Sequence, residues 1–195
     1  MTQLILMVGH VGAGKTTRAT RLARDTGAVR LTPDEWMGPL FRHHDPEGMR
    51  DVLEGRLVWT ALEMLRAGTD VILDFGFWGR DERAALAWAA GRLGARVRTE
   101  HVDVDRETQS RQVARRWEET PEQTWEVTQA DLDRWRTMLQ EPDAAELSGI
   151  YSEPQPAEGW AAWISRRWPS SAARTSAGDV FPGPGVVSAE DPPGA

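Results

Sequence analysis

The sequence contains one short motif whose residue types and spacing suit the binding of phosphate groups. Residues 9–16 read Gly-His-Val-Gly-Ala-Gly-Lys-Thr, which fits the pattern G-x-x-x-x-G-K-[S/T]. Lys15 is the single lysine of a chain that otherwise uses arginine for its cations. A compact ammonium on a flexible stem fits inside a loop wrapped around phosphates, whereas a planar guanidinium needs more room. The motif therefore predicts that the chain binds a nucleoside triphosphate through its phosphates.

The motif also predicts the role of each residue in the loop. Backbone N–H groups should cradle the β- and γ-phosphates, helped by the positive end of the helix that follows. Lys15 should bridge the same phosphates, Thr16 should hold Mg²⁺, and Thr17 should reach the α-phosphate. The expected phosphate contacts all lie within residues 9–17 and are Gly9, Val11, Gly12, Ala13, Gly14, Lys15, Thr16 and Thr17.

Two carboxylates follow apolar strands and are candidates for chemistry. Asp74 ends the run 71–73, where a carboxylate at the carboxyl edge of a parallel sheet can support Mg²⁺ through water; alternatively, it only starts the next turn. Asp34 follows a second strand and could accept the proton of an attacking hydroxyl. The alternative for Asp34 is a helix start, with Thr32 as N-cap, Pro33 at the first helical position and Glu35 completing a capping box.

Basic and aromatic residues supply the remaining candidates. Arg111 and Arg115 lie four apart on one expected helix, so they share a face and could close over the phosphates as a lid; alternatively, they form a solvated face paired with Glu107 or Glu118. The candidates for binding the acceptor of the phosphoryl group are Asp34, Trp36, Trp78, Arg80 and Arg83. Other tryptophans, including Trp135, have the spacing of core residues, and the four histidines show no metal-ligand pattern.

The elements expected around these residues alternate between strand and helix. Strands are expected at 4–8, 29–31, 71–73 and 97–104, with a short one possible near Ile150, and helices at 16–25, 45–67, 81–92 and 106–117. Strands that alternate with helices predict an α/β fold with a parallel sheet between two helical layers. Residues 1–168 are expected to form this domain. The Pro-, Gly- and Ser-rich segment 169–195 is expected to be a disordered tail.

Composition narrows the classes of partner. A net charge of −7 with a pI near 5.2 disfavours a general nucleic-acid-binding surface. There is no cysteine, so a disulfide framework or a thiolate metal site is excluded. The first residues lack a basic segment and a long apolar run, so we expect neither a signal peptide nor a membrane span, and a cytoplasmic location.

Taken together, four features of the sequence resemble the predicted P-loop kinases of the AAA_33 type. They are residues 9–17, the Thr-Pro-Asp-Glu-Trp at 32–36, the Ile-Leu-Asp ending at Asp74 and the Arg111/Arg115 pair. Their relatives include polynucleotide 5′-hydroxyl kinases, gluconate-type kinases, zeta toxins and chloramphenicol phosphotransferase. The resemblance covers roughly residues 1–150. It implies a P-loop NTPase fold of three α/β/α layers with a small helical lid, Asp34 as general base, Arg111 and Arg115 as lid arginines, and residues 139–143 beside adenine.

The resemblance and the residues together predict an enzyme that uses ATP and Mg²⁺ and transfers the γ-phosphoryl group to a hydroxyl of a small molecule. Two alternatives stay open: a polynucleotide 5′-hydroxyl kinase, and a nucleotide-dependent switch that hydrolyses ATP and phosphorylates nothing. A GTPase switch is disfavoured because the guanine-reading N-K-x-D motif cannot occur in a chain without asparagine. Neither the acceptor nor the oligomeric state follows from the sequence.

Overall fold

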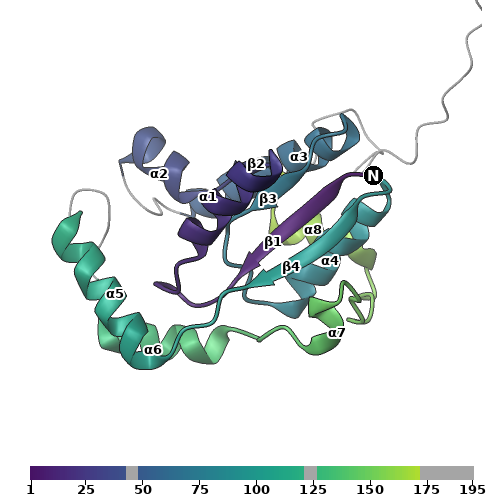
Figure 1. Cartoon of the computed structure of the whole chain (residues 1–195). Helices are drawn as coiled ribbons and strands as arrows, with labels where there is room; N and C mark the ends of the chain where they lie inside the picture. Colours follow the sequence, from purple (N-terminus) through teal and green to yellow (C-terminus); the bar gives the residue numbers. More distant parts are fainter. Residues whose placement is uncertain (43–47, 121–126, 172–195) are drawn as a thin grey trace, which may run out of the picture.

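Four parallel strands form the centre of the protein, in the order β2-β3-β1-β4 (Figure 1). The structure is a computed structural model that describes residues 1–42, 48–120 and 127–171. The strands are β1 (Gln3–Val8), β2 (Val29–Leu31), β3 (Val71–Leu73) and β4 (Arg96–His101). In register, Leu4 of β1 lies opposite Val71 of β3 and Val97 of β4. All three pairings are parallel, so the carboxyl ends of the strands meet at one edge of the sheet.

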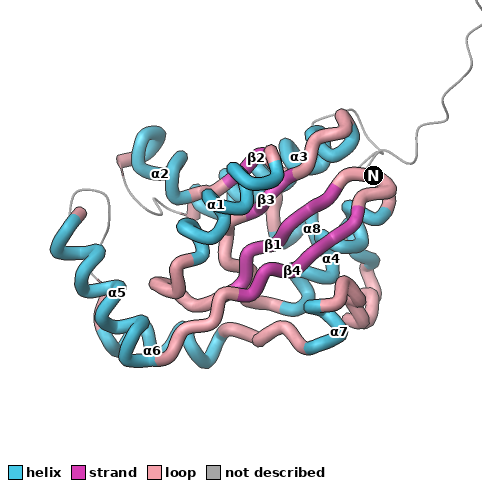
Figure 2. Tube along the Cα trace, viewed as in Figure 1, coloured by secondary structure: helices cyan, strands magenta, loops and turns pink. Residues whose placement is uncertain are grey.

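The two faces of the sheet pack against different helices because successive side chains in a strand point to opposite sides. Ile5, Met7 and Ile72 form one apolar cluster with residues of α1 (Lys15–Thr26). Alternate strand residues form a larger cluster on the other face with α3 (Met49–Arg66), α4 (Arg80–Gly91) and α8 (Gly159–Arg167). The fold is therefore a three-layer α/β/α sandwich (Figure 2), as expected.

The remaining helices lie at the edges of this sandwich. Helix α2 (Asp34–Phe41) follows β2, and α7 (Ala144–Leu147) lies beside β4. Helices α5 (Arg106–Glu119) and α6 (Gln129–Met138) extend beyond the carboxyl ends of β1 and β4 (Figure 1). Arg136 of α6 donates to the side chain of Gln109 in α5 and to the Val104 carbonyl, at 2.7 Å in both cases. These bonds tie the two helices together next to the loop that follows β1.

Most of the expected elements are confirmed, and strands 29–31 and 71–73 have the predicted bounds. The capping box before α2 is wrong: Thr32 is buried, Pro33 occupies the N-cap position without a side-chain bond, and Glu35 pairs with Arg30. No strand forms near Ile150, where the described chain is irregular and the side chain is exposed.

Several expectations concern the ends of segments. The expected helix start at 45–46 lies outside the described residues, and so do residues 172–195 of the expected tail 169–195. Ser170 and Ser171, at the beginning of that expected tail, pack on α3: the Ser170 hydroxyl donates to the Val52 carbonyl, and Ser171 is buried. Among the described residues, no helix combines the length and the apolar character needed to cross a membrane.

Candidate active site

The loop between β1 and α1 is shaped by glycines that have close neighbours. Gly9 has a φ of +147°, and a Cβ at this position would collide with the Val102 carbonyl. Gly12 has a φ of +78°, and a Cβ there would lie 2.6 Å from the Val113 side chain of α5. Positive φ values and such contacts suit glycine alone. The loop is thereby held tightly between β4 and α5, with its following helix pointed at the cavity.

The N-terminus of α1 is arranged to receive an anion. Its first turn, all of which the structure describes, contains no acidic residue, and Gly14 at the N-cap supplies no side-chain bond. The backbone N–H groups and the helix dipole at such an end attract negative charge. Val11, Gly12 and residues 14–17 line the cavity, whereas Gly9 and Ala13 do not. Ala13 instead donates its N–H to the His10 carbonyl at 3.1 Å, inside the loop.

Lys15 lies half-buried across the mouth of this loop. Its Nζ donates to the carbonyls of Gly9 and His10, at 2.9 and 2.8 Å. Burial lowers the pKa of Lys15 from 10.5 to about 8, and the nearby carboxylates of Asp74 and Asp34 partly oppose that effect. A cation whose charge is poorly solvated gains more from an anionic ligand than an exposed one does. The geometry thus suits contact with phosphate.

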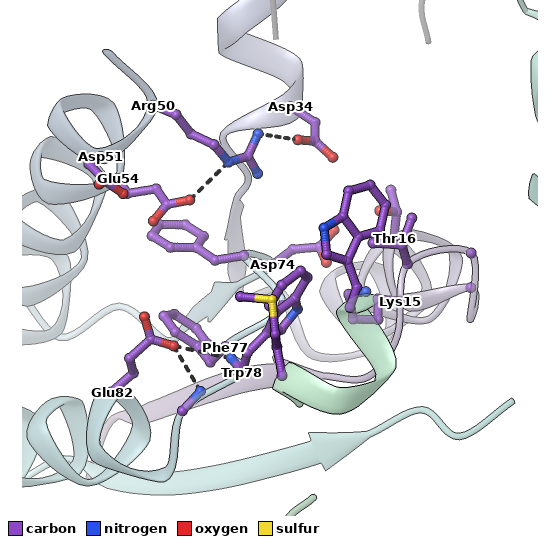
Figure 3. Close-up of a pocket in the computed structure, with 18 of the residues that line it drawn as sticks. Lys15, Thr16, Asp34, Arg50, Asp51, Glu54, Asp74, Phe77, Trp78 and Glu82 are labelled. Carbon is purple, nitrogen blue, oxygen red and sulfur yellow. Dashed lines mark hydrogen bonds and ion pairs between the residues drawn. The ribbon is translucent and has the colours of Figure 1, made fainter. Parts of the chain in front are cut away.

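Asp74 lies at the end of β3 against Thr16 (Figure 3). Its carboxylate is buried, accepts a hydrogen bond from the Thr16 hydroxyl, and lies 3.2 Å from the Arg30 guanidinium. Burial raises the pKa of Asp74, while the Thr16 hydroxyl, Lys15 and Arg30 act to lower it. One hydroxyl and one carboxylate fit Mg²⁺, which takes few protein ligands and completes its shell with phosphates and water. The donor set is therefore the one expected for the metal.

Asp34 faces the same cavity from the first turn of α2. Its carboxylate accepts a hydrogen bond of 2.9 Å from Arg50 of α3, and Arg50 also donates to Glu54 at 3.1 Å (Figure 3). Glu54 is buried and accepts a bond of 3.3 Å from the indole N–H of Trp168. Burial raises the pKa of Glu54, and Arg50 is the largest influence in the opposite direction. Arg50 thus fixes Asp34 to the body of the domain.

All these groups line one cavity of about 1100 Å³. Pockets for a single small molecule usually measure roughly 300–1,000 Å³, so this cavity lies slightly above the upper end of that range. Lys15, Thr16 and Asp74 line it beside the loop, and Asp34 faces the same space from α2. Sequence reasoning missed several lining residues, because only packing of distant segments brings them here: Arg50, Asp51, Glu54, Glu82, Trp163 and Arg167.

Helix α5, which carries the expected lid arginines, turns a different face to the cavity from the expected one. Arg111 pairs with Glu107 and Arg115 with Glu119 on the outside of α5, and neither lines the cavity. The alternative expectation, a solvated face paired with Glu107, describes Arg111. Arg116 lines the cavity instead, together with its helical neighbour Gln112. The helix turns this way because Gln109, one turn earlier, donates to the Val11 carbonyl at 2.9 Å.

Some of the expected acceptor-binding residues line the cavity and others do not. Trp78 lines the cavity and stands 6.2 Å from Trp135, which also lines it and is not a core residue. Trp36 is exposed and does not line the cavity. Arg80 binds Asp143 at 2.9 Å and lies outside it. Arg83 is fully buried.

Arg83 is a structural residue in this fold. It forms an ion pair with Glu146 and donates to the carbonyls of Phe77, Trp78 and Gln140. A guanidinium with this many protein partners has no donor directed at a ligand. It holds the segment between β3 and α4 against the segment around 140, and so shapes the cavity from outside.

Comparison with known proteins agrees with this geometry. The sequence model of the AAA_33 family, described as an AAA domain, matches residues 4–142. The chain belongs to the AAA_33 family. No similar sequence was found among curated proteins.

Several solved structures share the fold at low sequence identity. A chain of the Pnkp1/Rnl/Hen1 RNA repair complex matches with a TM-score of 0.60 and 16% identity over 80% of this chain and 53% of that chain. This protein thus spans about half the length of that relative. Kti12 of Chaetomium thermophilum, in complex with ADP-AlF3, gives 0.57 and 18% over 87% and 100%. A gluconokinase from Sinorhizobium meliloti 1021 gives 0.50 and 17% over 87% and 91%. The AAA_33 chain therefore has the fold of the P-loop kinases.

Proposed function

We propose that the protein is a kinase that transfers the γ-phosphoryl group of ATP to a hydroxyl of a small molecule. One observation carries the proposal: Lys15, Thr16, Asp74 and Asp34 face a single cavity that continues beyond the phosphate-binding loop to a second region lined by α3, α4 and α8. A switch that only hydrolyses ATP needs the first three groups but has no use for a second compartment. The fold shared with a gluconokinase supports the same conclusion.

The ATP phosphates would lie against the loop, the N-terminus of α1 and Lys15. Mg²⁺, when bound, would neutralise phosphate charge, with Thr16 and Asp74 as its protein-side contacts. Arg116 of α5 would take the role that the sequence suggested for Arg111 and Arg115, because it is the lid arginine that lines the cavity. A cation at this place stabilises charge on the transferring group.

Asp34 would act as the general base. The acceptor oxygen attacks the γ-phosphorus, the bond from that phosphorus to the β–γ bridging oxygen breaks, and ADP leaves. The proton of the acceptor hydroxyl passes to the Asp34 carboxylate, which Arg50 holds in place at 2.9 Å. Arg50 holds the carboxylate in one orientation, as a positioned base requires.

The test is transfer of labelled phosphate from ATP to a panel of hydroxyl compounds, compared with release of free phosphate. The panel includes a 5′-hydroxyl oligonucleotide, so that a polynucleotide kinase would reveal itself. Asp34→Asn keeps the shape of the side chain but removes the base, so transfer should fall by about 10²- to 10⁴-fold. ATP binding, measured by calorimetry on the same variant, should stay within about twofold, because Asp34 does not belong to the loop.

A matched control is Asp25→Asn, which removes a carboxylate of α1 that pairs only with the exposed Arg21 among described partners. It should leave transfer and binding unchanged. Release of free phosphate without transfer to any compound, at a rate unaffected by Asp34→Asn, would contradict the kinase proposal and favour the switch.

A further inference from the structure

The cavity has a second end that lies away from the phosphate-binding loop. It is formed by the start of α3, by the stretch between β3 and α4 with the first turn of α4, and by the second half of α8, with Asp34 of α2 at its border. Figure 3 shows Arg50, Asp51 and Glu54 of α3 opposite Lys15, with Glu82 below them. We call this end the acceptor compartment. Helix α8, which supplies Trp163 and Arg167, lies beyond residue 142, where the match to the AAA_33 family ends.

Acidic side chains outnumber basic ones in the acceptor compartment. Of the described residues that line it, two carry guanidinium groups, Arg50 and Arg167. The lining carboxylates are those of Asp34, Asp51, Glu54, Asp81 and Glu82. Even if the buried Glu54 carries a proton, the compartment retains net negative charge. This is the reverse of the loop end, where Lys15, Arg116 and the N-terminus of α1 attract anions.

The two arginines are already engaged by these carboxylates. Arg50 bridges Asp34 and Glu54. Arg167 donates to Asp51 and to Glu82, at 2.8 Å in both cases. Glu82 in turn accepts from the backbone N–H groups of Trp78 and Gly79, at 3.1 Å. An anionic acceptor would have to break these bonds to reach a guanidinium, and the uncovered carboxylates would then repel it.

Aromatic side chains form the apolar part of the same compartment. Phe75, Phe77, Trp78 and Trp163 all line it. Aromatic faces attract organic cations, and carboxylates around them strengthen that attraction. Net negative charge and aromatic lining therefore favour the same class of ligand, a molecule with an ammonium group and an apolar portion.

We propose that the acceptor compartment selects alcohols that carry positive charge, such as amino sugars and amino alcohols, over neutral alcohols, and neutral alcohols over anionic ones. This inference rests on the proposed kinase function and specifies its substrate class. It assigns to Asp51, Glu82 and the end of α8 the role of setting the charge of the acceptor.

The experiment uses matched triads, each a set of three alcohols that share one carbon skeleton and differ in a single group, which is an amine, a neutral group or a carboxylate. One triad is glucosamine, glucose and glucuronate, and a second is built on phenylpropanediol. The kcat/KM for transfer from ATP should be at least about tenfold higher for the amine than for the carboxylate. The 5′-hydroxyl oligonucleotide should rank with the carboxylates.

Asp51→Asn then tests the source of the preference. Asp51 is half exposed at the rim, and the change removes one unit of negative charge while preserving shape. The ratio of amine to carboxylate should fall by about fivefold, the size expected for one charge under partial solvent screening. Asp25→Asn, which removes a charge outside the cavity, should leave the ratio unchanged.

Binding of the same triads is also followed by thermal shift with a non-hydrolysable ATP analogue, which requires no transfer. Preferential binding of the amines without transfer to any of them would overturn the kinase proposal and leave the charge selectivity standing. Equal use and equal binding of the three members, or preference for the carboxylate or the oligonucleotide, would overturn the inference itself.

Discussion

The poorly solvated ammonium of Lys15 should make nucleotide binding consume a proton at alkaline pH. In the ligand-free protein its pKa is about 8, so roughly a tenth of the molecules lack this proton at pH 7 and roughly nine-tenths lack it at pH 9. Anionic phosphates against the ammonium favour its charged form and raise the pKa again. Binding of ATP at pH 9 should therefore take up close to one proton, against about a tenth of a proton at pH 7.

Isothermal titration calorimetry in two buffers of different ionisation enthalpy measures this uptake directly. The signal has a clear origin because the chain contains no second lysine, and the N-terminus lies at the far end of β1 from the loop (Figure 1). ATP affinity should also fall above pH 8, by up to about tenfold for each pH unit. Binding enthalpies that do not depend on the buffer at pH 9 would refute the reasoning about Lys15.

The same residue affects the stability of the ligand-free protein. A pKa of about 8 in the folded state against 10.5 for an ordinary lysine corresponds to about 3 kcal/mol. Below pH 8 both states hold the proton and the cost of burying the charge is fully present. Between pH 8 and 10.5 the unfolded chain binds more protons than the folded one, so the free energy of unfolding gains this amount as the pH rises. Lys15→Met should remove that part of the pH dependence in urea unfolding.

Three further predictions concern the frame of the site. Gly12→Ala places a methyl group 2.6 Å from Val113 at a φ of +78°, and it should cost about 2–3 kcal/mol of unfolding free energy. The control Gly27→Ala has a φ of +75° with open space around it, so it should cost about 1–2 kcal/mol. Equal losses of the two variants in urea unfolding would contradict the clash with Val113. Arg83→Met leaves a buried carboxylate without its partner and should cost about 3–5 kcal/mol in the same assay, and a loss below about 1 kcal/mol would rule out the structural role. Removal of residues 172–195, whose composition cannot form a core, should change the melting temperature by less than about 3 °C, and a larger fall would show that the tail packs on the domain.

Local sequence signals were enough to predict the phosphate end of the site. The strand 71–73 is a continuous apolar run that ends at Asp74, so its bounds and the place of the carboxylate follow from pattern alone. The spacing of the two glycines and the lysine in G-x-x-x-x-G-K-[S/T] is specific to a phosphate-binding loop. Its residues are adjacent in the chain, and no tertiary information is needed to bring them together.

The lid arginine and the acceptor end could not be predicted because both depend on packing between distant segments. Helical spacing shows that Arg111 and Arg115 share a face, but it does not show which face of α5 turns inward. That orientation depends on the bond from Gln109 to the loop. Arg167 lies 116 positions from its partner Asp51, and no local pattern relates the two.

The tryptophans around the cavity give the protein a built-in optical reporter. Trp78, which follows β3, stands 6.2 Å from Trp135 of α6, with the rings tilted by 49°. Two indoles at this distance and inclination couple their strong electronic transitions, so the pair contributes a couplet of opposite signs to the far-ultraviolet circular dichroism. Trp78 belongs to the segment between β3 and α4, and Trp135 belongs to the helices beside the loop. The pairs Trp160–Trp163 and Trp163–Trp168 are similarly close and contribute as well, so the share of this pair is the part of the couplet that Trp135→Phe removes. That share reports the separation between α6 and the segment before α4, without any label added to the chain.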